Sequence, residues 1–340
     1  MRSRYLLATF FGGVCLFFSL ISSSFGKEVN VYSFRQEFLM APLIEAFKEE
    51  TGIEVNIVFA KKGLINRLEA EGSNSPADLL LTSDFSKLQQ AKSKGLTQPV
   101  SSGELNTNIP ANLRDSEGHW YGLTKRVRAI YVSKDRVKED EITSYEELAY
   151  EIWYERICTR SGKHPYNLAL LASMIAHYGE ADAEAWLAGL KNNLVRKPAG
   201  NDRAQVKGIY SGECDVSLGN SYYLGKMLAK EDQQAWADSV RIIFPNQEDR
   251  GAHINISGVT MTAAAKNKAE ALAFMEFLSS DTAQKIYAEV NYEYPVKEGV
   301  APSELVASWG EFKGDQLPLS EVANLIKAAS DMVDRVGYDF

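Results

Sequence analysis

The fold class of this chain is decided by residues 29–82, VNVYSFRQEFLMAPLIEAFKEETGIEVNIVFAKKGLINRLEAEGSNSPADLLLT. Apolar residues in this stretch change from the spacing of strands to the spacing of helices and back. The runs that suit strands are Val29–Tyr32, Val55–Phe59 and Ala77–Thr82, and the helical patterns between them are Pro42–Thr51 and Leu64–Glu71. Strands that alternate with crossover helices pair in parallel, so the stretch predicts an α/β domain.

The same alternation resumes after a third helical pattern at Phe85–Lys94 and continues to the end of the chain. Strand-like runs are Trp120–Val132, Ile157–Thr159, Cys214–Leu218, Arg241–Phe244 and Ile254–Thr262. Helical patterns are Tyr166–Tyr178, Asp182–Asn193, Asp202–Tyr210, Tyr222–Lys230, Lys266–Ser279, Asp281–Val290 and Ser320–Val336. No flexible linker interrupts them, which predicts two α/β lobes joined by strands, with a ligand cleft between the lobes.

The lobes are expected to be discontinuous in sequence. We predict an N-terminal lobe from residues 27–125 and about 251–300, and a C-terminal lobe from about 126–250 and 301–340. The length of 340 residues agrees with two domains.

Composition and charge exclude several classes of protein. Apolar residues make up 45% of the chain and charged residues 24%, which is typical of a soluble globular protein and not of a disordered one. A net charge of −8 argues against nonspecific binding of nucleic acid, which needs a basic face. Four histidines and three cysteines, against 16 tyrosines, argue against a zinc site.

The first 26 residues have the pattern of a secretory signal peptide. Arg2 and Arg4 precede an apolar run from Tyr5 to Ile21, and the small residues Ser24 and Gly26 suit a cleavage site. The alternative is an uncleaved membrane anchor. Cleavage would leave 35 basic against 45 acidic residues, a net charge of about −10, in an exported protein.

Export also changes the interpretation of the cysteines. Cys15 would leave with the signal, and Val14 before it does not suit lipidation. Cys158 and Cys214 would remain in an oxidising compartment, where they could form a disulfide or stay as two buried free thiols.

No catalytic motif stands out in the sequence. It has no G-x-S-x-G, no H-E-x-x-H and no phosphate-binding loop lysine, and its histidines are scattered, at His119, His164, His177 and His253. We therefore expect a binding protein and not an enzyme.

Three tyrosines lie where strands give way to helices. Tyr222 and Tyr223 follow the Cys214 strand, and Tyr166 follows the Cys158 strand. Both junctions would emerge at one edge of a sheet, so the three side chains could converge. Phenolate is a hard anionic donor that binds ferric iron, which makes them candidate Fe³⁺ ligands. The alternative is that the rings only pack and donate hydrogen bonds outward.

Basic residues at other strand ends suit a small oxyanion. Arg35 and Gln36 follow the first strand, and Arg126 and Arg128 lie in the long run into the second lobe. Arginine binds planar oxyanions through two parallel hydrogen bonds. Three phenolates leave positions open on an octahedral metal, and an anion held here would complete its shell. Alternatively, the arginines form salt bridges at the lobe boundary.

Several motifs in the same order resemble the periplasmic ferric-iron-binding proteins of bacterial ABC importers. They are Val31–Gln36, Thr51–Val58, Ser75–Thr82, Trp120–Thr124, Arg126–Arg128, Gly219–Tyr223 and Ile256–Gly258, and they span nearly all of the exported chain. The resemblance implies the two-lobed type II solute-binding fold, capture of Fe³⁺, an inner-membrane permease with its ATPase as partners, and a monomer.

The resemblance also implies roles for individual residues. Tyr166, Tyr222 and Tyr223 correspond to the tyrosines that ligate iron. Many members carry His-Tyr after the first-lobe arginine, where this chain has Gln36-Glu37. The chain therefore resembles the branch in which three tyrosines and a synergistic carbonate or bicarbonate complete the shell.

In that branch the Arg-Gln pair holds the anion, which points to Arg35 and Gln36, with Arg126 or Arg128 nearby. Glu37 could itself ligate iron. Tyr32 would lie behind the site or only pack.

Three rival functions remain open: a receptor for an organic solute such as a polyamine or thiamine, a secreted enzyme, and an iron-binding protein with a protective role.

Overall fold

The computed structural model describes residues 27–340. The predicted signal peptide, residues 1–26 with Cys15, lies outside the described residues. Between residues 27 and 340, no helix is long and apolar enough to cross a membrane.

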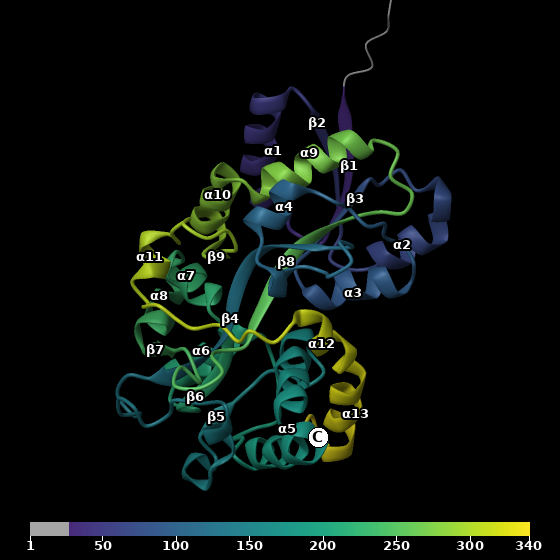
Figure 1. Cartoon of the computed structure of the whole chain (residues 1–340). Coiled ribbons are helices and arrows are strands. Elements are labelled where there is room, and N and C mark those ends of the chain that lie inside the picture. The colour runs from purple at the N-terminus through teal and green to yellow at the C-terminus, as the bar shows by residue number, and fades with distance from the viewer. Residues whose placement is uncertain (1–26) are drawn as a thin grey trace, which may run out of the picture.

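The first lobe is built as the opening stretch predicts (Figure 1). Strand β1 (Glu28–Ser33) pairs in parallel with β2 (Glu54–Phe59) on one side and β3 (Leu79–Thr82) on the other. Helices α1 (Glu37–Thr51), α2 (Leu64–Glu71) and α3 (Phe85–Ser93) follow these strands in turn. The β-α-β-α-β prediction is confirmed.

Two long strands connect the lobes. β4 (Tyr121–Ser133) and β8 (Ile254–Met261) pair antiparallel and run from the upper to the lower lobe in Figure 1. A single sheet therefore crosses the molecule, in the order β2-β1-β3-β8-β4-β6-β5. A short strand, β9 (Tyr294–Pro295), pairs with Thr124 and Lys125 of β4.

The second lobe repeats the α/β arrangement. Strands β5 (Ile157–Cys158) and β6 (Val216–Asn220) are parallel, and β7 (Val240–Ile243) pairs with β4. Its helices are α5 (Pro165–Asn192), α6 (Asp202–Tyr210), α7 (Tyr222–Leu228), α8 (Glu231–Asp238), α12 (Leu319–Asn324) and α13 (Ile326–Val336). The C-terminal helix α13 packs on α5. The exact lobe boundaries stay a prediction.

The remaining helices are short or lie on the first lobe. They are α4 (Gly103–Asn108), α9 (Lys268–Ser279), α10 (Asp281–Asn291) and α11 (Glu304–Ala307), with 3₁₀ turns at Gly72–Asn74, Ala111–Leu113, Glu146–Ala149 and Glu151–Trp153. Helices α1 and α9 meet through Phe47 and Phe274, whose ring centroids are 4.8 Å apart.

Several predicted boundaries are wrong in ways that have a local cause. Helix α1 begins at Glu37 and not at Pro42, so it tolerates the proline at the expense of one backbone hydrogen bond. The predicted helix at Ser320–Val336 is two helices that meet at Leu325. The helical run of α5 is interrupted at Gly179, whose φ of 81° an L-residue rarely adopts, which agrees with the two helices expected there.

The cysteines of the second lobe are bonded to each other. Cys158 and Cys214 form a disulfide with 5.9 Å between their Cα atoms, and both are buried. Cys214 lies just before β6 and not within it, because that strand begins at Val216.

Candidate metal centre

The three candidate tyrosines lie together at one edge of the second lobe. Strands β5 and β6 are parallel neighbours, so the helices that follow them begin side by side. The hydroxyl of Tyr166, at the start of α5, is 3.3 Å from that of Tyr222, at the start of α7. The ring centroids of Tyr222 and Tyr223 are 4.3 Å apart. Three phenol oxygens are thereby gathered from two helix starts.

These tyrosines line a cavity of about 640 Å³ between the lobes. The opposite wall is formed by Arg35, Gln36 and Ser83 of the first lobe and by Glu293, which follows α10. Tyr166, Tyr222, Tyr223, Arg203, Lys226 and Lys230 line the cavity from the second lobe. The structure therefore brings Arg35 and Gln36 to the same cavity as the tyrosines.

Positive charge surrounds the phenol rings. The guanidinium carbons of Arg126, Arg128 and Arg160 lie 5.5, 5.9 and 5.4 Å from the ring centroid of Tyr166. The Nζ atom of Lys226 lies 4.8 Å from the ring centroid of Tyr222. Cations at this range stabilise the deprotonated form of a phenol.

Burial opposes that stabilisation. Removal from water raises the pKa of Tyr222 well above its usual value, and the neighbouring Tyr166 and Tyr223 raise it further. Burial also raises the pKa of Tyr223 and lowers the pKa of Lys226 to about 8. The phenols of Tyr222 and Tyr223 are therefore protonated at neutral pH until a strong Lewis acid takes the place of their protons.

A buried ion pair faces the tyrosines from the opposite wall. Arg35 Nη2 lies 3.0 Å from Glu293 Oε2, and their side chains are 2% and 4% exposed. The hydroxyl of Thr124 donates to the same carboxylate at 2.7 Å. Burial alone would raise the pKa of Glu293, but the positive charges of Arg35 and Arg126 lower it to about 2. Glu293 is thus a fixed negative charge that orients Arg35.

The two arginines of β4 have different partners. Arg126 donates to the carbonyl of Ser83 and lies 4.0 Å from Glu293, so it stands between the tyrosines and the first lobe. Arg128 Nη1 is 2.7 Å from a carboxylate oxygen of Asp202. Neither Arg126 nor Arg128 is part of the cavity wall, and both contact Tyr166 at the ring face. In this structure the guanidinium of Arg128 is held by Asp202, and its predicted role on the anion stays a prediction.

Two other candidates lie apart from the cavity. Glu37 is exposed on the first turn of α1 and is not part of the cavity wall, in contrast to the adjacent Gln36. Tyr32 donates to the carboxylate of Glu71 at 2.9 Å and packs in a separate apolar cluster of the first lobe. The packing expected of Tyr32 agrees with its place in this cluster, and a ligand role for Glu37 stays a prediction.

Sequence reasoning missed Glu293, Asp202 and Lys226. Lys226 had a detectable signal, because a residue four positions after Tyr222 lies on the same helix face. Glu293 had none, since it follows α10 and is far in sequence from its hydrogen-bond partners Arg35 and Thr124.

The donor set of the cavity is unusual for a metal site. In the part of the chain that the structure describes, no group of three or more His, Cys, Asp or Glu side chains could hold a metal ion. A metal in this cavity would therefore be held mainly by phenol oxygens, which as phenolates suit a small trivalent cation.

Comparisons with known proteins agree with this chemistry. The family model for bacterial extracellular solute-binding proteins matches residues 74–310. Iron uptake protein A1 of Synechocystis is 44% identical over 315 residues, which cover 92% of this chain and 88% of that protein.

Solved structures of high similarity carry the same kind of description. Ferric iron-binding protein A of Mannheimia haemolytica, in an open conformation, superposes with a TM-score of 0.90 at 50% identity, over 92% of this chain and 99% of that one. A Trichodesmium protein in complex with iron and citrate ligands superposes with a TM-score of 0.89 at 42% identity, over 92% and 99% of the two chains.

Proposed function

This chain belongs to the bacterial extracellular solute-binding proteins, and we propose that it captures Fe³⁺ between its lobes for an ABC iron importer. The observation that carries the proposal is the convergence of Tyr166, Tyr222 and Tyr223 on one cavity. Relatives described as iron uptake and ferric iron-binding proteins, similar over nearly the whole chain, support it.

The three tyrosines are the proposed ligands. On binding, Fe³⁺ replaces the phenolic protons, and three phenolates balance its charge. Carbonate or bicarbonate from solvent completes the shell, oriented by Arg35 and Gln36, with Arg126 close to both phenolates and anion. Glu293 keeps Arg35 in place through their 3.0 Å ion pair.

Capture begins on the second lobe, which carries all three tyrosines. Closure then brings Arg35 and its anion from the first lobe, and contacts that exist only in the closed state stabilise that state. The protein is exported by residues 1–26, works in the periplasm as a monomer, and docks in its closed form on the inner-membrane permease with its ATPase.

The charge of the cavity favours this function over a receptor for organic cations. Arg35, Arg203, Lys226 and Lys230 line it, against the single carboxylate of Glu293, which Arg35 already neutralises. A polyamine or thiamine is itself cationic and would be repelled. Phenolates with a bound oxyanion, in contrast, are stabilised by such walls.

Loading with iron tests the proposal directly. Purified protein mixed with ferric citrate and bicarbonate, then freed of excess iron, should hold stoichiometric iron and show a visible phenolate-to-iron charge-transfer band. Metal analysis and the absorption spectrum measure both. A colourless protein without iron would overturn the proposal, and iron without the band would overturn the tyrosine assignment.

Iron retention should fall steeply as the pH falls. Burial raises the pKa of Tyr222 and Tyr223, so these groups are protonated in the iron-free protein and must release protons on binding. Release of two or three protons weakens the apparent affinity by about 10²–10³-fold for each unit of decrease in pH. Competition with citrate from pH 8 to pH 5 measures this slope, and an affinity independent of pH would contradict it.

A further inference from the structure

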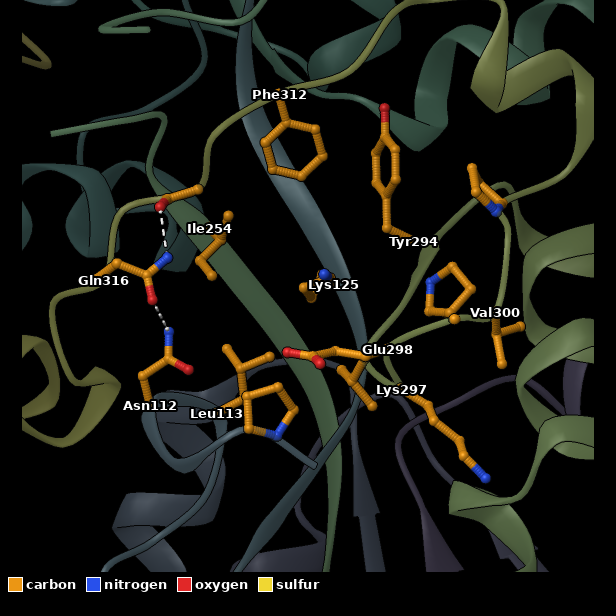
Figure 2. Close-up of a pocket in the computed structure, with 16 residues that line it drawn as sticks. Asn112, Leu113, Lys125, Ile254, Tyr294, Lys297, Glu298, Val300, Phe312 and Gln316 are labelled. Carbon is orange, nitrogen blue, oxygen red and sulfur yellow. Dashed lines mark hydrogen bonds between the residues drawn. The ribbon is translucent and has the colours of Figure 1, made fainter. Parts of the chain in front are cut away.

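A second cavity, of about 400 Å³, lies on the other face of β4 (Figure 2). Neighbouring side chains on a strand point to opposite faces. Arg126 faces the tyrosines, whereas Lys125 lines this second cavity. In the same way Glu293 faces the tyrosines, and the adjacent Tyr294 lines the second cavity. This rear cavity is therefore a separate space behind the strands that carry the metal centre.

Two opposite charges face the rear cavity without a partner. Within residues 27–340, neither Lys125 nor Glu298 makes a hydrogen bond or an ion pair through its side chain. Lys125 is half-buried and points into the middle of the cavity in Figure 2, and Glu298 is exposed at its mouth. By contrast, the lining residue Lys297 pairs with Asp281 at 2.6 Å.

Lys125 and Glu298 face each other across the rear cavity without forming an ion pair. Burial lowers the pKa of Lys125, and the negative charge of Glu298 opposes that shift, so the two groups interact across the cavity. They are nevertheless farther apart than an ion pair allows. The ammonium of Lys125 is partly removed from water and has no hydrogen-bond acceptor, which costs free energy. A ligand that bound both Lys125 and Glu298 would offset that desolvation cost.

Apolar side chains form another part of the wall. The rings of Tyr294 and Phe312 meet edge to face, with centroids 4.7 Å apart and an interplanar angle of 72°. Leu113, Ile254 and Val300 continue this surface around the cavity (Figure 2). Asn112 donates to Gln316 at 3.3 Å and joins two of the segments that form the rim.

We infer that the rear cavity binds a free α-amino acid with an apolar side chain. Its carboxylate would pair with Lys125, its ammonium with Glu298, and its side chain would pack on Tyr294 and Phe312. A simple carboxylate would be repelled by Glu298 and a simple amine by Lys125, so the ligand needs both charges. The volume lies in the range of small-molecule sites.

Isothermal titration of the purified protein with L-phenylalanine and L-leucine tests the inference. We expect saturable binding of at least one of them with a dissociation constant below about 1 mM. Phenethylamine and 3-phenylpropionate, which each lack one charge of phenylalanine, should bind at least about tenfold more weakly.

Variants identify the location. Lys125→Met and Glu298→Gln should each weaken binding by at least about tenfold. Lys48→Met, whose lysine pairs with Glu54 and does not line the rear cavity, should leave binding unchanged. Circular dichroism confirms folding, and the exposed position of Glu298 protects that variant from a folding defect.

Two results would overturn the inference. One is the absence of saturable binding of both amino acids up to about 10 mM. The other is unchanged binding in both Lys125→Met and Glu298→Gln. Iron plays no part in this experiment, so its outcome is independent of the metal centre.

Discussion

Tyr222→Phe should weaken the charge-transfer colour and weaken iron binding by at least about 10³-fold, on the order of 4 kcal/mol. The substitution removes only the oxygen, so the buried ring still packs beside Tyr223. The phenolate of Tyr222 is one of three that would balance the charge of Fe³⁺, and no carboxylate, thiolate or imidazole cluster among the described residues could replace it.

The matched control is Tyr210→Phe, which removes a hydroxyl from an exposed tyrosine of the same lobe, on α6. This variant should keep both colour and affinity. Titration against a competing chelator, followed by absorbance, measures the two variants side by side. If Tyr222→Phe binds iron as the unmodified protein does, the ligand assignment is wrong.

Asp202→Asn should destabilise the protein by about 3–5 kcal/mol, because it leaves two guanidinium groups without their carboxylate in a buried place. Asp202 has no exposed surface and lies 2.7 Å from Arg128 and 2.9 Å from Arg160. Both arginines also flank the ring of Tyr166, so the variant should loosen the metal centre as well.

Urea unfolding at pH 7 measures the loss, which corresponds to a decrease of roughly 10 °C in Tm. Burial alone would raise the pKa of Asp202, but Arg128 and Arg160 reverse this effect and lower it. The stabilisation is therefore present above the pKa of the unfolded state and is lost as the pH falls through the lower, folded value. The difference between the two proteins should shrink in acid.

The control for this effect is Lys327→Met, which breaks an exposed ion pair with Asp331. Exposed pairs contribute little, since solvent and salt screen them, so no change in the unfolding midpoint is expected. Equal stability of Asp202→Asn and the unmodified protein would show that the buried charge cluster does not stabilise the lobe.

Local pattern was sufficient to predict most of the fold. The β-α-β-α-β order of residues 29–82 follows from the spacing of apolar residues and from stop signals such as Gly52, which adopts the left-handed conformation expected of it at φ 70°. The errors at Glu37 and Leu325 are errors of helix ends, which the spacing of apolar residues locates only to within a few residues.

The tyrosines were predictable for the same local reason. Tyr166 and Tyr222 follow strands and open helices, and parallel neighbouring strands bring such junctions to one edge of the sheet. Arg35 and Gln36 likewise follow the first strand. The order of strands and helices can be predicted from the sequence, and that order was sufficient to predict that these residues lie close together.

The sequence by itself determined the two α/β lobes, the tyrosines and the residues after the first strand, because each depends on neighbours in the chain. Only the tertiary structure decided that Glu293 pairs with Arg35, that Asp202 pairs with Arg128, and that Lys125 lines a rear cavity. Those contacts join residues up to 258 positions apart. Their free energy depends on burial and on the exact approach of charges, which no local pattern of residues encodes.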